Sequence, residues 1–316
     1  MRIVFMGTPD FSVPVLDALI EAGHEIAGVV TQPDKPKGRG KAVAMTPVKE
    51  KALEHGLSVY QPLKVRTPEF VQVLRELKPD VMVVVAFGQI LTKEVLDIPP
   101  LGCVNVHASL LPKYRGAAPI QWAVIDGEKE TGVTTMMMDE GIDTGDMLEK
   151  EIVPIEDEET GDSLHDKLMA AGARLIVSTL KKIQDGTIER TPQTDEETCY
   201  ARMLKKDMGD VDWSLDAHAI ERLVRGLNSW PGTYTKWNGK TVKIWKAKAV
   251  DREYEGALGE AVYVDKETIL VKTGKGCLSL LELQPEGKKR MAADAVLRGY
   301  QVDLHTVFQS QKERNV

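Results

Sequence analysis

A carboxamide and an imidazole lie two residues apart in the segment Asn105-Val106-His107. The apolar residues around them predict a buried strand, and alternate side chains of a strand share one face. After His107 the chain enters a loop with a proline and a glycine, so both polar groups belong at the carboxyl end of a strand, where α/β sheets bind ligands. An amide that donates to an oxyanion, beside a base titrating near pH ~6.5, suits acyl-group transfer.

An acidic, glycine-punctuated loop, Asp139–Asp146, could supply the group that orients the imidazole. We expect Asp143 to face His107 and to take part in proton transfer there. A solvated turn is the alternative interpretation of this loop. A calcium loop is excluded, because Gly141 stands where a ligand is needed and no glutamate closes a twelve-residue loop. His107 has no second His or Cys at ligand spacing, so we expect no metal.

Strand and helix patterns alternate through the first half of the chain. The predicted strands are 2–6, 25–31, 59–60, 81–86, 103–106 and 132–138, and the predicted helices are 10–22, 47–55, 68–77, 119–125 and 163–185. We expect Thr67 to cap the helix 68–77, with Pro68 in its first turn, and Ser163 to cap the helix 163–185. Strands separated by helices predict an α/β domain with a doubly wound, mostly parallel, Rossmann-like sheet.

The pattern changes after residue 189. Residues 190–206 are polar and carry Pro192, which indicates a linker. Beyond it, Ser214 is the expected cap of a helix at 216–227, and short alternating runs separated by turn residues follow. Asn238-Gly239 between two such runs is a strong hairpin signal. We therefore predict a catalytic domain at 1–189, a linker at 190–206 and a small OB-like β-barrel at 207–316.

Composition limits the class of protein. No run of 18 apolar residues appears, and the amino-terminal apolar stretch is too short for a signal peptide, so we expect neither a membrane span nor secretion. Three widely separated cysteines fit a reduced, cytoplasmic protein, and we expect Cys103 to be a small buried hydrophobe rather than a nucleophile. Nothing demands a dimer, and we expect a monomer.

Two basic segments stand out against a net charge of −7. The loop 32–49 is long for a compact domain and carries five basic residues, Lys35, Lys37, Arg39, Lys41 and Lys49, against Asp34 alone. A solubilising surface loop is one interpretation, and a loop that orders on phosphates is the other. The predicted barrel interleaves Lys243, Lys246 and Lys248 with Trp245, which fits either a nucleic-acid face or a core tryptophan rimmed by lysine stems.

Nucleotide-binding loops are excluded. The segment Gly7–Asp10 follows the first strand, but Pro9 and Ser12 stand where a dinucleotide fingerprint needs glycines. Pro9 also removes a backbone donor that a phosphate would use. Neither Gly40-Lys41 nor Gly239-Lys240-Thr241 has the upstream glycine of a P-loop.

Taken together, these segments resemble the methionyl-tRNA formyltransferase family over almost the whole chain. They are Gly7–Phe11, Thr31–Asp34 with the basic loop, Asn105–Pro112, Arg115–Ile120, Asp139–Asp146, Trp213-Ser214, Trp230-Pro231 and Val242–Ala247. The blocks at 109–112 and 143–146 are shared by the wider formyltetrahydrofolate-dependent transferases and indicate the chemistry. The basic loop and the C-terminal segments indicate the tRNA-directed members.

The resemblance implies transfer of a formyl group from 10-formyltetrahydrofolate to the amino group of methionyl-initiator tRNA, for translation initiation. The implied catalytic residues are Asn105, His107 and Asp143. The implied folate contacts are Ser109, Leu110, Leu111 and Pro112, with Val84, Phe87 and Gly88 as a second wall. The implied tRNA contacts are Lys35, Lys37, Arg39 and Lys41 in the loop and Lys243, Lys246 and Lys248 in the barrel.

Two rival functions remain open from the sequence. Another formyltetrahydrofolate-dependent enzyme, acting on glycinamide ribonucleotide or an amino sugar, would not need two separate basic segments. A folate- or RNA-binding module without catalysis would not need Asn105, His107 and Asp143 together.

Overall fold

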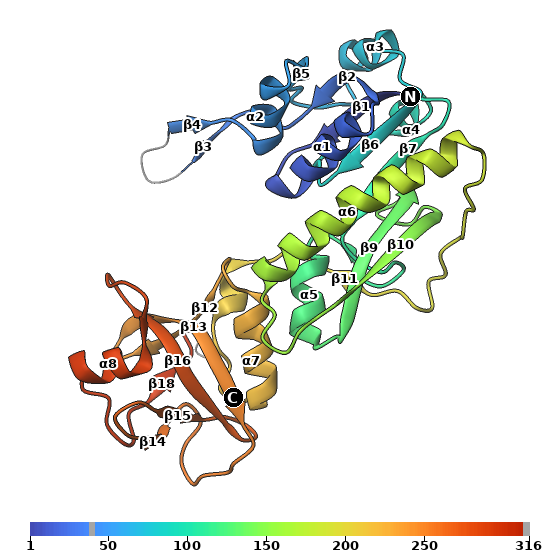
Figure 1. Cartoon of the computed structure of the whole chain (residues 1–316). Coiled ribbons are helices and arrows are strands. Elements are labelled where there is room, and N and C mark those ends of the chain that lie inside the picture. Colours follow the sequence, from blue (N-terminus) through green and yellow to red (C-terminus); the bar gives the residue numbers. More distant parts are fainter. Residues whose placement is uncertain (38–41, 312–316) are drawn as a thin grey trace. The chain divides into compact units, whose positions relative to one another are not determined.

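The computed structural model describes residues 1–37 and 42–311, which fall into two compact units (Figure 1). The first unit comprises Met1–Pro119, Glu130–Pro154 and His165–Ala201, and the second comprises Ile120–Lys129, Ile155–Leu164 and the chain from Arg202 onward. Each unit therefore contains residues from more than one stretch of the sequence.

A seven-stranded sheet forms the centre of the first unit, in the order β10-β9-β7-β6-β1-β2-β5. Its strands are β1 (Arg2–Gly7), β2 (Glu25–Val30), β5 (Val59–Tyr60), β6 (Val81–Val85), β7 (Cys103–His107), β9 (Glu130–Met137) and β10 (Met147–Pro154). The first five in sequence pair in parallel, whereas β9 pairs antiparallel with both of its neighbours, β7 and β10. The prediction of a doubly wound, mostly parallel sheet is confirmed.

Helices cover both faces of this sheet (Figure 1). One face packs against α3 (Pro68–Glu76) and α4 (Lys93–Leu96), where Leu74 and Val95 meet Val4 and Met82. The other face lies under α1 (Val13–Glu21), which follows the short helix η1 (Asp10–Ser12), and under α6 (Gly161–Gln184). A Cβ added at Gly172 of α6 would stand 3.0 Å from Cγ1 of Val106 in β7, so a larger residue there would force the helix and the sheet apart. The helix α2 (Pro47–Glu54) lies between β2 and β5 in the sequence.

Helix starts follow the capping rules, though not always at the expected residue. The Thr67 side chain accepts from the Phe70 N–H at 3.4 Å with Pro68 in the first turn, as predicted. At α6 the prediction of a Ser163 cap is wrong. Thr160 precedes the helix, and its Oγ1 accepts from the Ser163 N–H at 3.1 Å while Ser163 Oγ accepts from the Thr160 N–H at 3.0 Å. Ser163 is thus the third residue of a reciprocal cap.

Three pairings in the first unit were not predicted. The edge strand β10 carries charged residues, which break the apolar signal of a buried strand. The basic loop contains a short hairpin of β3 (Lys35–Lys37) and β4 (Ala42–Ala44). A two-residue parallel pair joins β8 (Arg115–Gly116) to β11 (Tyr200–Ala201).

The second unit is built on an antiparallel sheet in the order β14-β15-β16-β13-β12-β18, with β17 on β16. Its strands are β12 (Thr233–Trp237), β13 (Lys240–Val250), β14 (Ala261–Val264), β15 (Ile269–Lys272), β16 (Cys277–Pro285), β17 (Met291–Ala292) and β18 (Phe308–Gln309). Its helices are α5 (Pro119–Asp126), η2 (Lys206–Gly209), α7 (Ala217–Gly226) and α8 (Ala293–Gly299).

Backbone hydrogen bonds beyond the named strands close this sheet into a barrel. The Phe308 N–H donates to the Gly259 carbonyl at 2.7 Å, and the Ala261 N–H donates to the Thr306 carbonyl at 2.7 Å. These bonds join the two ends of the strand order, and closure removes the open edges of a sheet. The prediction of a barrel after the α/β domain is confirmed.

The hairpin β12–β13 turns at Asn238-Gly239, as predicted, with φ of 49° and 73°. The helix α7, which precedes this hairpin, begins one residue later than expected. Asp216, rather than Ser214, caps it by accepting from the His218 N–H at 2.8 Å. Ser214 instead donates to Asp212 at 2.6 Å. Across residues 1–37 and 42–311, no helix is long and apolar enough to span a bilayer.

Candidate active site

The two polar side chains of β7 share the sheet face that α3 and α4 cover. Val84 of β6 pairs with Asn105, while Thr134 of β9 pairs with His107. Both polar residues are buried, at 9% and 7% exposure. In the part of the chain that the structure describes, the Asn105 side chain makes no hydrogen bond to protein, so its amide is available to a ligand.

The His107 ring is held at one nitrogen and free at the other. Nε2 lies 2.9 Å from the Tyr114 carbonyl oxygen. Because a carbonyl only accepts, Nε2 carries a hydrogen, and Nδ1 is the nitrogen left to exchange a proton. Nδ1 lies 3.7 Å from Oδ2 of Asp143, an ion-pair distance rather than a hydrogen bond. The expected approach of Asp143 to His107 is therefore present.

Asp143 is fixed by its own loop and by a neighbouring one. Its backbone adopts φ of 55°, which Asp tolerates better than most residues. Its Oδ2 accepts from the Gly116 N–H at 2.8 Å. Gly116 itself has φ of 111°, and a Cβ there would stand 2.9 Å from the Ala201 carbonyl oxygen, so only glycine fits this position.

The segment Ser109–Pro112 folds back over β9. Thr134 Oγ1 donates to the Ser109 carbonyl at 2.7 Å and accepts from the Leu111 N–H at 3.1 Å. The Lys150 ammonium donates to the Leu111 carbonyl at 2.6 Å, and burial lowers the pKa of that ammonium. Ser109 Oγ donates to the Lys113 carbonyl at 2.7 Å. The backbone of this expected folate contact is thus rigid beside His107.

The second expected wall lies at the carboxyl end of β6. Thr8 and Gln32, which follow β1 and β2, both donate to the Phe87 carbonyl, at 3.0 and 3.2 Å. Gln32 also donates to the Gly88 carbonyl at 3.2 Å. The segments that follow the neighbouring parallel strands β1, β2 and β6 therefore meet at the carboxyl edge of the sheet, where open α/β sheets bind their ligands. Val84 and Phe87 are buried.

Cysteine and metal chemistry find no support at this site. Burial raises the pKa of the Cys103 thiol to about 12, so the thiol stays protonated and is a poor nucleophile. Among residues 1–37 and 42–311, no cluster of three His, Cys, Asp or Glu side chains could hold a metal ion.

Only part of the basic loop is described. Lys35 is exposed on β3, and Lys37 ends that strand. Arg39 and Lys41 lie outside the described residues. Lys49 instead binds Asp34 at 2.6 Å and Gln61 at 2.8 Å, so it anchors the base of the loop.

The lysines of β13 lie on the outer surface of the barrel. Val242, Ile244 and Ala247 point into the core. Ile244 and Ala247 are three positions apart instead of two, because the strand has a β-bulge at Trp245–Lys246. The bulge places Lys246 and Lys248 on the outer face with Lys243, and all three are exposed.

Trp245 is outside the barrel core as well. Its ring lies 5.5 Å from the Lys243 ammonium and 5.0 Å from the Arg290 guanidinium, and Nε1 donates to Gln284. The alternative of a core tryptophan is wrong, because Trp245 follows the inward-pointing Ile244 and strand alternation turns its side chain outward.

Several residues that shape the site were not assigned a role from the sequence. Tyr114 and Gly116 contribute backbone groups, which no pattern of side chains reveals. Thr134 and Lys150 lie on strands far along the chain from the loop that they fix. Gln193 donates to the Asp143 carbonyl from within the expected linker. Each acts through tertiary proximity.

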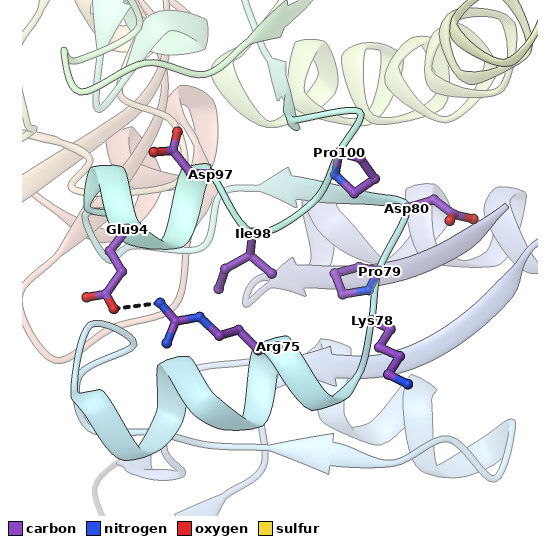
Figure 2. A pocket seen from close by; sticks show the side chains of 8 residues that line it. All are labelled: Arg75, Lys78, Pro79, Asp80, Glu94, Asp97, Ile98 and Pro100. Atoms are coloured by element: carbon purple, nitrogen blue, oxygen red, sulfur yellow. Dashed lines mark hydrogen bonds and ion pairs between the residues drawn. The ribbon is translucent and has the colours of Figure 1, made fainter.

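A surface hollow of the first unit lies elsewhere. Figure 2 shows it between α3, α4 and the residues that precede β6 and β7, with a volume of about 600 Å³. Arg75 and Glu94 pair across it at 2.8 Å, as the figure marks, and Asp80 accepts from the Arg2 N–H. The hollow is at the amino ends of the strands, opposite to the edge that carries His107.

Family profiles match most of the chain. The profile described as "Formyl transferase" matches residues 1–180, and the profile "Formyl transferase, C-terminal domain" matches residues 203–301. The chain belongs to the formyl transferase family.

Close relatives have a more specific name. The methionyl-tRNA formyltransferase of Agathobacter rectalis is 58% identical over 308 residues, covering 98% of this chain and 99% of that protein. The methionyl-tRNA formyltransferase of Clostridioides difficile is 51% identical over 308 residues, covering 98% and 100%.

Solved structures share the fold at low identity. An N-formyltransferase of Helicobacter canadensis, with folinic acid and dTDP-3-aminofucose, has a TM-score of 0.67 at 19% identity, covering 90% of this chain and 99% of that one. HypX of Aquifex aeolicus, with tetrahydrofolic acid, has a TM-score of 0.62 at 20% identity, covering 97% and 50%.

Proposed function

We propose that the chain transfers the formyl group of 10-formyltetrahydrofolate to the amino group of methionyl-initiator tRNA. The observation that carries this proposal is the meeting of three groups, in which Nδ1 of His107 lies 3.7 Å from Asp143 and the amide of Asn105 is free on the same strand. Close relatives named methionyl-tRNA formyltransferase support the choice of acceptor.

The reaction needs no enzyme nucleophile, because the methionyl amine attacks. As its nitrogen bonds to the formyl carbon, the carbonyl electrons move onto oxygen, and Asn105 and His107, as protonated or hydrogen-bonded donors, stabilise that oxygen. Asp143 positions the His107 ring and helps to collect the proton that the amine loses. The bond from the formyl carbon to N10 then breaks, the proton goes to N10, and tetrahydrofolate leaves.

The folate lies along the carboxyl edge of the sheet in this proposal. The backbone of Ser109, Leu110, Leu111 and Pro112 forms one wall, and Val84, Phe87 and Gly88 form the other. The hydrogen bonds that fix both segments support this role. Because these segments are already ordered, they can position 10-formyltetrahydrofolate without losing further conformational entropy themselves.

The tRNA contacts are assigned to two separate basic elements. Lys35, Lys37, Arg39 and Lys41 meet the acceptor region, and Lys243, Lys246 and Lys248 meet the outer backbone. The exposure of Lys35 and of the three barrel lysines supports phosphate contact. Arg39→Ala is expected to weaken tRNA binding with a dependence on salt, and an affinity unchanged at every salt concentration would remove the loop from the proposal.

The boundaries, compartment and assembly are part of the same proposal. We assign catalysis to residues 1–189 and tRNA binding to the barrel at 207–316, with 190–206 as the connection. Residues up to Ala201 of this connection pack with the first unit, and Ile120–Lys129 and Ile155–Leu164 pack with the second. Both substrates belong to the cytoplasm, so we place the protein there. A monomer suffices because one chain supplies all three catalytic groups, and light scattering coupled to gel filtration tests this.

The deciding experiment offers three acceptors with 10-formyltetrahydrofolate: charged initiator tRNA, glycinamide ribonucleotide and a dTDP-amino sugar. We expect formylation of the methionyl amine alone. Transfer to a nucleotide or sugar amine without transfer to the methionyl amine would overturn the acceptor, and transfer to none would overturn the enzyme.

A further inference from the structure

The segment 191–201 binds both loops that carry the active site. At one end Thr191 and Met147 exchange backbone hydrogen bonds of 2.8 and 2.9 Å. At the other end β11 pairs with β8, and the Cys199 carbonyl accepts from the Arg115 N–H at 3.0 Å. Within the segment, the Thr198 hydroxyl donates to the Pro112 carbonyl at 2.6 Å. The segment is therefore bonded along its length to the catalytic unit.

Gln193 is the member of this segment that reaches the catalytic loop. Its Nε2 donates to the Asp143 carbonyl at 2.8 Å and to the Gly145 carbonyl at 2.7 Å. Its Oε1 accepts from Nε of Arg115 at 2.9 Å. Because Arg only donates, the Arg115 contact fixes which end of the amide is oxygen, and so directs both N–H groups at the loop.

Arg115 is itself firmly placed. Its side chain is 2% exposed, it also binds Asp195 at 2.8 Å, and its neighbour Gly116 donates to the Asp143 carboxylate. A buried, doubly bonded guanidinium is a rigid anchor. Asp143 is thus held from both sides by one dipeptide, directly through Gly116 and indirectly through Arg115 and Gln193.

Asp143 needs such support because of its backbone. At φ of 55° the residue occupies a sparsely populated region, which persists only where the surroundings determine it. Its carboxylate must also stay within reach of Nδ1 of His107, 3.7 Å away. Two hydrogen bonds to the carbonyls at 143 and 145 meet that need.

We propose that Gln193 is a positioning residue for formyl transfer, which sets the place of the Asp143 carboxylate at His107 by holding the carbonyls of Asp143 and Gly145. This inference rests on the proposed function. It assigns the site a residue from the segment between the two family-profile matches, where no catalytic contribution was expected.

Gln193→Glu tests the inference with the smallest change in shape. A carboxylate keeps the contact to Arg115 but has no N–H to give, and it repels both carbonyls. We expect kcat to fall about 10- to 100-fold, since a misplacement near 1 Å costs that much. The KM for tRNA is expected to stay within about twofold, because the basic residues assigned to tRNA lie elsewhere.

A double-mutant cycle separates positioning from general loss of structure. In an Asp143→Asn background, single-turnover rates with excess enzyme are expected to change less than about twofold on adding Gln193→Glu. An equal loss in both backgrounds would overturn the inference. Gln193→Met, which has similar length and no donors, repeats the test if the Glu variant does not fold.

One control accompanies these variants. Gln72→Glu makes the same chemical change on an exposed turn of α3, far from the catalytic loop. It is expected to keep kcat. If the wild-type protein does not formylate methionyl-tRNA, the proposed function is refuted. If the wild type is active and the Gln193→Glu variant is equally active, only the role of Gln193 is refuted.

Discussion

The charged side chains at the catalytic edge of the sheet are largely buried and fixed, whereas those on the basic face of the barrel are exposed. Asp143 and His107 are mostly buried, and each is fixed by hydrogen bonds to backbone groups. Lys243 and Lys248 are exposed on β13, and Lys246 has one exposed partner, Glu158, at 2.9 Å. The first arrangement fixes a few groups before the substrate binds, whereas the second keeps the lysine side chains exposed to a ligand.

This contrast reflects the two tasks. A developing oxyanion is small, and donors stabilise it only from fixed positions in a site that excludes water. A phosphate backbone is long, and neutralising it depends on the number of cations more than on their exact placement. Single substitutions should therefore be severe at the sheet edge and graded on the barrel.

The largest effect is expected from Asn105→Ala and His107→Ala. Each removes a group assigned to the formyl oxygen, so kcat should fall ~100–1,000-fold, about 2.7–4 kcal/mol in the barrier. Steady-state kinetics with 10-formyltetrahydrofolate and methionyl-tRNA measure it, with circular dichroism as the test of folding. Near-normal turnover in either folded variant would remove the sheet edge from the mechanism.

A smaller and graded effect is expected on the barrel. Changing Lys243, Lys246 and Lys248 together to Ala should weaken tRNA binding roughly tenfold at physiological salt. The slope of the affinity against salt should fall by about one unit for each phosphate that is no longer neutralised. Filter binding across a salt series measures both quantities, and kcat at saturating tRNA should hold.

The matched control for the barrel is Lys266→Ala, which removes an exposed lysine from the turn between β14 and β15. If this variant loses as much affinity per charge as the β13 variant, the barrel attracts tRNA by its mean charge and β13 has no special role.

The smallest effect is expected at Glu149, a partly buried and hydrogen-bonded carboxylate that lies away from the active site. Burial by itself would raise the pKa of the Glu149 carboxyl, but hydrogen bonds from Lys182, Thr179 and Ser178 outweigh it and hold that pKa below its usual range. Such a carboxylate stabilises the fold above the unfolded-state pKa, and this stability is lost as pH falls through the lower folded pKa. Glu149→Gln should therefore cost about 1 kcal/mol at neutral pH.

Urea denaturation between about pH 7 and pH 3 measures that cost across the range in which the carboxyl titrates. The difference between wild type and Glu149→Gln should shrink at the acid end, whereas Glu94→Gln, in an exposed pair with Arg75, should change little throughout. A difference that stays constant into the acid range would show that the carboxylate is not what Glu149 contributes.

The sequence sufficed wherever the deciding chemistry is local. Thr67 before Pro68 begins a helix because cap and first turn are neighbours in the chain. Asn238-Gly239 makes a hairpin because both residues accept positive φ. The apolar run at 81–86 predicts the strand β6, and the shared face of Asn105 and His107 follows from strand alternation.

The sequence failed where two candidates compete or where the partner is distant. Both Thr160 and Ser163 could cap α6, and only the folded chain decides which precedes the first turn. The charged edge strand β10 has no apolar face to detect. Gln193 lies in a polar, proline-bearing stretch that resembles any linker, and its role depends on carbonyls 48 and 50 residues earlier.

The chain passes between its two compact units more than once, since Ile120–Lys129 and Ile155–Leu164 belong with the C-terminal barrel. A single recombination point therefore cannot transfer the complete C-terminal unit from one relative to another. A graft that begins at residue 202 would leave behind two segments to which α7 is bonded, since Arg222 donates to the Ile125 carbonyl and Arg225 to the Glu159 carbonyl. A chimaera keeps these contacts only if both segments are transferred with the barrel.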